Sequence, residues 1–321
     1  MIRAAALLAA LAIAAPAQGA ERLTLATWNL EWMMLPATFD ELAPKCSPSD
    51  HRLPGSARAI PCNIVPEKRW DGADLARMRA FIAPLPLDVV ALQETDGAAV
   101  AAQLFQDHEF CFTKRRHVQN VGFAIRRGIP HRCNTDYHEL GLADGQVRWG
   151  ADLTLYPGTK RQVRLLSVHL KSGCNRDPLT KDRPECRVLQ QQVPLLERRI
   201  DQRAKRRESF AVLGDINRRF DTERRDEARD ARGRIAALWP EIDDGEPAEA
   251  DLVNAAGERT VINCGREEGA RAMIDHMIFS RWLGRRLVAE SFRTWRYPLG
   301  ARWPDHCLLA VELELEDRDG V

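Results

Sequence analysis

An acid and an amide follow an apolar, strand-like run in the segment VLGDIN, residues 212–217. They are Asp215 and Asn217, and they lie two positions apart at the end of what reads as a buried strand. A carboxylate can orient a water molecule or accept its proton, while a neutral amide can donate to a phosphate oxygen without adding negative charge. The pair therefore indicates the hydrolysis of a phosphate ester.

Other polar residues with useful chemistry also lie at or just beyond the ends of strand-like segments. Each has a structural alternative when it is taken alone: Asn29 could cap a turn, Glu94 could be a solvated strand end, and His169 could be a satisfied structural imidazole. Their occurrence at six successive segment ends favours a single site instead. The set consists of Asn29, Gln93 with Glu94, His169 with Lys171, Asp215 with Asn217, Asp275 with His276, and Asp305 with His306.

The chemistry of phosphate hydrolysis accounts for the residue types in this set. A hard divalent cation offsets the negative oxygens, and Mg²⁺ prefers one or two carboxylates plus water to a full protein cage. We expect Glu94 to be the first ligand of Mg²⁺, with Mn²⁺ or Ca²⁺ as alternatives. Either His169 or His306 can accept a proton from water while the other supports the phosphate or the leaving oxygen. Asp275 or a neighbouring carboxylate could hold His306 in the required tautomer.

Apolar periodicity predicts the elements that must position these groups. Residues 22–30 alternate as a strand, and residues 87–95 form a continuous apolar run that is typical of a strand covered on both faces. Helical patterns occur at residues 73–85 and 187–207, and we expect Pro194 to kink or break the second. Further strands are expected at residues 109–114, 121–127, 147–158, 161–171, 210–217, 272–280 and 306–315. The mixture predicts an α/β fold, a four-layer α/β/β/α sandwich of two packed, mostly antiparallel sheets.

The N-terminus has the pattern of an exported protein. Arg3 precedes an apolar run of roughly 12 residues, which is too short to span a bilayer, and small residues follow it. Residues 1–20 are therefore expected to be a signal peptide, and residues 21–321 one domain with a disulfide-pinned insertion at about 34–70. We expect a periplasmic or secreted monomer with no transmembrane segment after the signal is removed.

The eight cysteines agree with export, because an even set can pair in an oxidising compartment. No two cysteines have the two-residue spacing of a zinc knuckle, which disfavours a metal site as the alternative. The sequence does not prove the connectivity, and we favour local pairs because each closes a modest loop. These pairs are Cys46–Cys62, Cys111–Cys133, Cys174–Cys186 and Cys264–Cys307.

Net charge does not demand a nucleic-acid partner. The chain has 47 Lys and Arg residues against 46 Asp and Glu residues, so loss of Arg3 with the signal would leave the charges balanced. Cations cluster between residues 198 and 207. They could form a helix face that follows phosphates, and the alternative is a solvated helix end with cations near its C-terminus.

Six short motifs, TWNL, ALQET, SVHLKSG, LGDIN, IDHMIFS and PDHCLLAVEL, extend from Thr27 to about Leu313. In order and context they resemble the endonuclease/exonuclease/phosphatase superfamily. Its members include secreted deoxyribonucleases of the DNase I type, AP endonucleases, neutral sphingomyelinases and inositol polyphosphate phosphatases. The resemblance implies the same sandwich and a divalent-metal phosphodiesterase site.

The resemblance also implies a role for each matching residue. Which of Asp215 and His306 activates water stays open, and strand alternation is expected to turn His276 away from the acid beside it. The metal-side residues are Asn29, Glu94 and Asp305, the phosphate-contacting or general-acid histidine is His169, and the phosphate and water residues are Asp215 and Asn217. The general base is His306, its supporting acid is Asp275, and the substrate-facing candidates are Asn120, Arg126 and Lys171.

Three functions are compatible with these residues. The first is an exported, metal-dependent nuclease that hydrolyses DNA or RNA phosphodiester bonds. The second keeps the chemistry but acts on phosphorylated head groups, as a sphingomyelinase-like enzyme or an inositol-phosphate phosphatase, and predicts an exposed apolar hairpin such as residues 32–35. The third is an inactive binding module, which the presence of Glu94, Asp215 and His306 disfavours. AP endonucleases have no histidine at the position of His169, which places the chain closer to secreted nucleases and sphingomyelinases.

Overall fold

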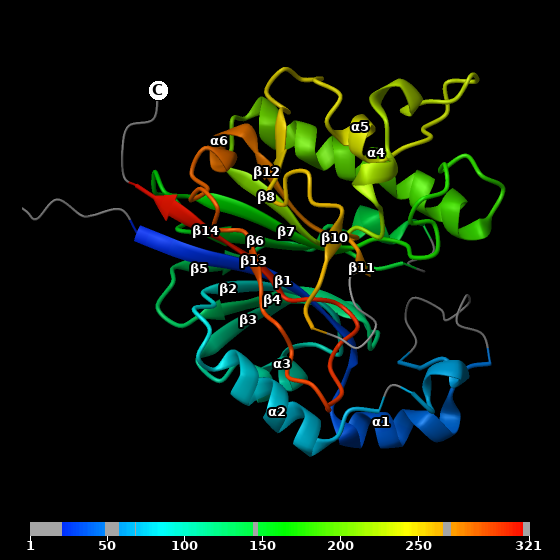
Figure 1. Cartoon of the computed structure of the whole chain (residues 1–321), viewed down its shortest axis with the longest axis vertical. Coiled ribbons are helices and arrows are strands. Elements are labelled where there is room, and N and C mark those ends of the chain that lie inside the picture. The colour runs from blue at the N-terminus through cyan, green and yellow to red at the C-terminus, as the bar shows by residue number, and fades with distance from the viewer. Residues whose placement is uncertain (1–20, 49–57, 68, 144–146, 266–270, 317–321) are drawn as a thin grey trace, which may run out of the picture.

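The computed structural model describes residues 21–48, 58–67, 69–143, 147–265 and 271–316. Two sheets of six strands face each other, and helices cover their outer sides (Figure 1). The predicted signal peptide, residues 1–20, lies outside the described residues. Within the described ranges, no helix combines the length and the apolar character needed to cross a bilayer.

The first sheet has the strand order β13-β14-β1-β2-β4-β3, and only its β1–β2 pair is parallel. Helices α2 (Gly72–Ile82) and α3 (Ala98–Leu104) lie on its outer face (Figure 1). The strands are β1 (Glu21–Met33), β2 (Val89–Thr95), β3 (His108–Phe112), β4 (Asn120–Arg126), β13 (Arg293–Thr294) and β14 (Leu309–Leu315).

The second sheet has the order β5-β6-β7-β8-β12-β9, and only its β7–β8 pair is parallel. Its strands are β5 (His131–Cys133), β6 (Ala151–Leu155), β7 (Val163–His169), β8 (Phe210–Asp215), β9 (Leu252–Asn254) and β12 (Asp275–Ser280). The outer helices are α4 (Pro184–Lys205), α5 (Trp239–Ile242) and α6 (Arg281–Gly284), and β10 (Val261–Ile262) pairs with β11 (Arg271–Ala272). This arrangement confirms the predicted four-layer, mostly antiparallel sandwich.

The side chains of β8 show why buried strands read as continuous apolar runs. Ala211 and Leu213 pack in the core between the sheets, while Phe210 and Val212 pack in the layer beneath α4. Both faces of the strand are covered, so neither face needs polar residues. α4 itself is one helix with Pro194 inside it, so the break that we considered there does not occur.

Helix α2 shows how capping residues and an apolar stripe in the local sequence determine where a helix begins and which face it buries. The Asp71 side chain accepts from the N–H of Asp74 at 2.8 Å, and the Asp74 carboxylate accepts from the N–H of Asp71 at 3.1 Å. This reciprocal capping satisfies two donors at the start of the helix. Leu75, Met78 and Ile82 then form its buried stripe against the first sheet.

A buried carboxylate attaches α4 to the second sheet. Asp152 of β6 accepts from Arg199 at 2.5 Å and also from Arg203, both on α4. Arg164 of β7 and Asn134 donate to its other oxygen at 3.3 Å and 2.7 Å. Two arginines of the predicted basic helix therefore point inward, so they do not form a face that follows phosphates.

The insertion at residues 34–70 contains more regular structure than its lack of period suggested. It holds α1 (Pro36–Leu42) and the 3₁₀ turns η1 (Ala43–Lys45) and η3 (Cys62–Ile64). Met34, Phe39 and Ile60 form a small apolar cluster of their own. Because Met33 and Met34 are buried, residues 32–35 do not form the exposed apolar hairpin that a lipid substrate would favour.

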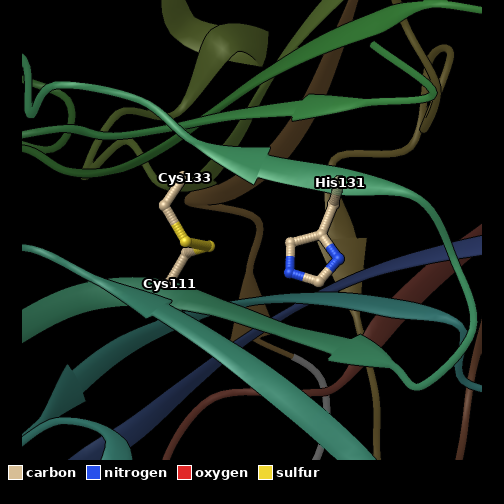
Figure 2. Close-up of side chains that lie close together, drawn as sticks. All are labelled: Cys111, His131 and Cys133. Atoms are coloured by element: carbon tan, nitrogen blue, oxygen red, sulfur yellow. A yellow bond between two sulfur atoms is a disulfide. The ribbon is translucent and has the colours of Figure 1, made fainter.

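Four disulfides join the cysteines in the pairs that were favoured from the sequence. Cys111 lies on β3 and Cys133 on β5, which are edge strands of opposite sheets, so this bridge links the two sheets directly (Figure 2). His131 lies beside it, and the three residues place possible ligand atoms within 4.8 Å of one another. A metal would need free thiolates, which the disulfide does not provide.

Removal of the bridge between the sheets is expected to destabilise the fold. The double change Cys111→Ala with Cys133→Ala should lower the free energy of unfolding by about 2–3 kcal/mol, because the unfolded chain loses a constraint over a loop of moderate length. Urea unfolding of the oxidised proteins measures the change. An unchanged midpoint would show that the apolar cores alone hold the two sheets together.

Candidate active site

Three adjacent strands of the second sheet end at the same edge with polar residues. The parallel pairing of β7 with β8 sets His169 beside Asp215, and the antiparallel pairing of β8 with β12 sets Asp215 beside Asp275. Directly paired residues point to the same face of a sheet. The three buried side chains therefore share one face at one edge.

Asn29 joins this group from β1 of the other sheet. Its Nδ2 donates to Asp215 Oδ2 at 3.0 Å and to Glu94 Oε1 at 3.3 Å. Its Oδ1 accepts from the N–H of Glu31 at 3.0 Å. The amide thus links the two carboxylates while its oxygen accepts from the backbone, and the metal-side role expected for Asn29 stays a prediction.

Glu94 lies near the end of β2, where its backbone has a φ of 53°. Its Oε2 accepts from the N–H of Trp32 at 3.1 Å and from Gln119 Nε2 at 3.0 Å. Burial raises the pKa of Glu94, and Asp305 adds to this effect, while Arg148 opposes it. The charged carboxylate is therefore unfavourable as it stands, and a bound cation would stabilise it.

His306 completes the cluster from the loop before β14. Its Nδ1 lies 2.6 Å from Asp275 Oδ2, and its Nε2 lies 3.7 Å from Asp215 Oδ2. Burial alone would lower the pKa of His306, but the charges of Asp275 and Asp215 outweigh burial and raise it well above its ordinary value. Burial also raises the pKa of Asp215. The two groups lie close enough to exchange a proton through one water molecule.

His169 contributes an uncharged imidazole. Its Nε2 lies 3.4 Å from Asp215 Oδ2 and 3.8 Å from Glu94 Oε1. Burial, together with the positive charges of Arg148 and His306, lowers the pKa of His169 well below its ordinary value. Because Nε2 faces two carboxylates, it is the nitrogen that carries the proton. Its buried Nδ1 has no hydrogen-bond partner among the described residues.

Arg148 holds the end of β7 and was not predicted. Its Nε donates to the carbonyl of His169 at 3.0 Å, and its Nη2 donates to the carbonyl of Leu170 at 2.8 Å. Its Nη1 donates to Gln119 Oε1 at 3.1 Å. Since Gln119 in turn donates to Glu94, this buried guanidinium connects two parts of the cluster. Burial lowers the pKa of Arg148.

Asn217, Asp305 and Lys171 lie around this cluster. Asn217 has a φ of 56° and donates through Nδ2 to the carbonyl of Leu170 at 3.1 Å, so its amide holds the loop after β7. Asp305 Oδ1 lies 3.9 Å from His306 Nε2. Lys171 lines the adjoining cavity. The structure therefore brings these three predicted residues to the same place.

The structure does not bring Arg126 to the cluster. It lies at the far end of β4, where its Nε is 3.2 Å from Asp88 Oδ1, and the strand separates it by roughly 20 Å from the near end. Asn120 lies at the near end, but its amide donates to the carbonyl of His117 and accepts from Thr113 Oγ1. The expected substrate contact of Arg126 in this site is thus wrong, and the Asn120 side chain is engaged within the protein.

A cavity of about 720 Å³ opens beside the cluster, with Glu94 and His169 in its lining. Other parts of its lining come from the insertion, at Pro61, Asn63 and Ile64, and from the first turns of α4. Its cationic lining residues are Arg115, Arg148 and Lys171. Gln119 also lines it and immediately precedes β4. Arg148 precedes β6, which begins at Ala151, although the expected strand at residues 147–158 included it. Neither residue was predicted for the site, because an apolar period does not show which polar side chains converge from different segments.

The donors in this cluster fit a hard divalent cation. Glu94, Asp215 and Asp305 supply carboxylate oxygens, which Mg²⁺, Mn²⁺ and Ca²⁺ prefer to sulfur or nitrogen. Asp215, Asp275 and His306 also place possible ligand atoms within 4.8 Å of one another. The raised pKa of Glu94 also supports a cation site, because burial makes the negative charge of this carboxylate unfavourable and a bound cation would offset it.

Comparison with known proteins shows the class of fold. No family model matches the chain, and no curated protein sequence matches it either. Solved structures of the endonuclease/exonuclease/phosphatase superfamily do match over nearly the whole chain. The chain therefore has the DNase I-like fold of that superfamily.

Three solved structures illustrate the likeness. An AP endonuclease from Archaeoglobus fulgidus has 12% sequence identity and a TM-score of 0.54, over 90% of this chain and 98% of that chain. The 3′-5′ exonuclease NExo from Neisseria meningitidis has 14% identity and a TM-score of 0.52, over 91% and 99%. Truncated TDP2 from Caenorhabditis elegans has 14% identity and a TM-score of 0.53, over 91% and 97%.

Proposed function

We propose that this protein is a divalent-metal-dependent phosphoric ester hydrolase that cleaves phosphodiester bonds of nucleic acids. The observation that carries the proposal is the convergence of Asn29, Glu94, His169, Asp215 and the Asp275–His306 pair from both sheets into one buried cluster. No structural role requires three acids and two imidazoles to meet at the edge of an apolar core. Hydrolysis of a phosphate ester uses all of them.

Asp215 and His306 are suited to remove a proton from the attacking water. Asp275 holds His306 Nδ1 at 2.6 Å and leaves Nε2 directed toward Asp215. Burial raises the pKa of Asp215 to about 7, which brings proton acceptance by this carboxylate into the range in which an enzyme works. The charges of Asp275 and Asp215 raise the pKa of His306 and favour its protonated form, which can return a proton. We assign proton transfer to this pair as a unit, with Asp275 as the positioning residue.

His169 and Arg148 are suited to act on the phosphate. The uncharged His169 can donate from Nε2–H to a phosphate oxygen, which favours a contact role over that of a general acid. Arg148 fixes His169 through its backbone carbonyl and presents a positive charge to the same cavity. A guanidinium in this position attracts an anionic substrate.

Glu94 and Asp305 would hold the metal. A bound Mg²⁺ supplies positive charge against the phosphate oxygens and favours deprotonation of water. Removal of divalent ions with EDTA is expected to abolish activity, and Mg²⁺ should restore it.

Glu94→Gln is expected to raise the Mg²⁺ concentration for half-maximal rate by about tenfold or more, because a charged ligand is lost. Titration of Mg²⁺ into the metal-free enzyme measures it. Glu185→Gln is the matched control, since Glu185 lines the same cavity outside the cluster. Equal Mg²⁺ dependence in both variants would remove Glu94 from the proposed ligands.

Two observations support nucleic acid as the substrate. Structures with the same fold include an AP endonuclease and a 3′-5′ exonuclease. Arg115, Arg148 and Lys171 in the cavity lining suit a polyanion. A lipid or inositol head group is the second candidate, but Met33 and Met34, the residues considered for contact of a lipid substrate's membrane, are buried.

We also propose that the protein is exported to the periplasm or secreted. The four disulfides support this location, because such bridges persist in oxidising compartments.

A substrate panel tests the proposed function. The full-length mature protein is incubated with Mg²⁺, Mn²⁺ or Ca²⁺ and with plasmid DNA, single-stranded DNA, RNA, sphingomyelin or inositol polyphosphates. We expect cleavage of at least one nucleic acid and none of the lipid. If only sphingomyelin or inositol phosphates were turned over, the cluster would instead be the active site of the second candidate, an enzyme that acts on phosphorylated head groups. Inactivity on every substrate would contradict both proposed functions.

A further inference from the structure

A second cavity, of about 380 Å³, lies outside the catalytic cluster. Rings from Phe220, Trp239 and His276 line it, together with Arg259, Thr260 and the acidic residues Asp221 and Glu258. Its lining comes from the segment after β8, the start of α5, β12, and β9 with the loop that follows it. Phe220 and Trp239 pack against the apolar layer between the second sheet and α4.

The three rings form a stack. The Phe220 and His276 centroids are 3.7 Å apart with planes at 13°, and those of Phe220 and Trp239 are 4.8 Å apart at 32°. His276 is fixed beneath them, because its Nε2 lies 2.9 Å from the carbonyl of Arg218. Phe220 and Trp239 keep partly exposed surface, while His276 is buried. The result is a rigid aromatic surface beside an open space.

This stack and the catalytic cluster meet at the same edge of the sheet. Asp275 and His276 are consecutive residues of β12, so their side chains leave opposite faces of one strand whose neighbouring Cα atoms lie about 3.8 Å apart. Phe220 follows closely after Asn217 in the segment that leaves β8. The cluster and the rings therefore lie on opposite faces of the same edge of the second sheet.

We propose that Trp239, supported from behind by Phe220, binds a nucleobase of the strand being cleaved, a few nucleotides from the scissile bond; this inference rests on the proposed nuclease function. Every base has a flat face that stacks on aromatic rings, so such a site adds affinity without sequence preference. Thr260 borders the cavity and can donate to the edge of the base. Arg259 also lines it, where its guanidinium donates to the carbonyl of Ala256 and lies over the Phe292 ring.

An oligonucleotide series with one abasic residue at successive positions tests this stacking site. Wild-type enzyme is expected to lose about tenfold in kcat/KM when the base is missing at one particular position. Trp239→Ala should lose a similar factor on the intact oligonucleotide and little more on the abasic one, because the same contact is already gone. Trp239→Phe, which keeps a ring, should restore most of the loss. A dinucleotide is too short to reach the rings, so Trp239→Ala should cleave it at the wild-type rate.

Trp282→Ala is the matched control, since Trp282 lies on α6 beyond the opposite end of β12. It should leave the response to the abasic position unchanged. An equal loss on dinucleotide and oligonucleotide in Trp239→Ala would show a structural role and overturn the proposal, as would a wild-type profile without a sensitive position. That wild-type profile needs no variant, so it stays decisive even if Trp239→Ala does not fold. Failure of the wild-type enzyme to cleave any oligonucleotide would instead refute the nuclease function, and the stacking site with it.

Discussion

His306→Ala is expected to lower kcat by about a thousandfold on any phosphodiester substrate, with the fold intact. The imidazole lies between Asp275 and Asp215, 2.6 Å and 3.7 Å away, so its loss removes the proton-transfer pair and leaves two acids without the cation between them. Steady-state kinetics at saturating Mg²⁺ measures the loss. Because the reacting phosphate should still bind, KM should change much less than kcat.

His138→Ala controls for the removal of an imidazole. The His138 side chain is 56% exposed and lies 3.8 Å from Asp136, away from the catalytic cluster. The activity of His138→Ala should match that of the wild type.

Asp275→Asn should reproduce part of the loss of kcat seen in His306→Ala, since it removes the acid that positions His306. Wild-type turnover in His306→Ala would exclude the proposed cluster as the catalytic centre.

Asp152→Ala is expected to lower the free energy of unfolding by about 3–5 kcal/mol. The change removes the shared partner of Arg164, Arg199 and Arg203 and leaves the buried Arg203 as a charge without its carboxylate. Burial already lowers the pKa of Arg203 to about 10, which shows how costly its charge is even with Asp152 present. Urea or thermal unfolding measures the loss.

Asp182→Ala is the matched control for this stability prediction. Asp182 also pairs with an arginine, Arg187 of α4, but its side chain is 98% exposed. Exposed ion pairs contribute at most about 1 kcal/mol, so this variant should unfold near the wild-type midpoint. Equal stability of both variants would mean that packing of α4, and not the buried carboxylate, attaches it to the sheet.

Predictions from the sequence succeeded where a property is local. The apolar runs identified the strands, and the polar residues that end them include His169, Asp215 and Asp275, which the strand register then sets side by side. Arg126 shows the limit of the same reasoning. It belongs to a correctly predicted strand, but it lies at the end that faces away from the cluster.

Asn29 shows a second limit, because its residue type and position did not determine its contacts. Its amide nitrogen, not its oxygen, faces Asp215, a residue 186 positions away in the chain. Hydrogen bonds of this kind depend on how the two sheets pack. A hydrophobic period records only that a face is buried, and not against what.

The sequence by itself determined the nine longer strands, helices α2 and α4, the four-layer class of fold and most of the polar residues at the strand ends, because burial and capping leave a pattern within each segment. Only the tertiary structure decided that Arg148 and Gln119 support Glu94 and His169, that two cations of α4 turn inward to Asp152, and that aromatic rings gather behind the catalytic edge. The physical reason is that these contacts join loops and faces distant in the chain, whose relative positions follow from the packing of the two sheets.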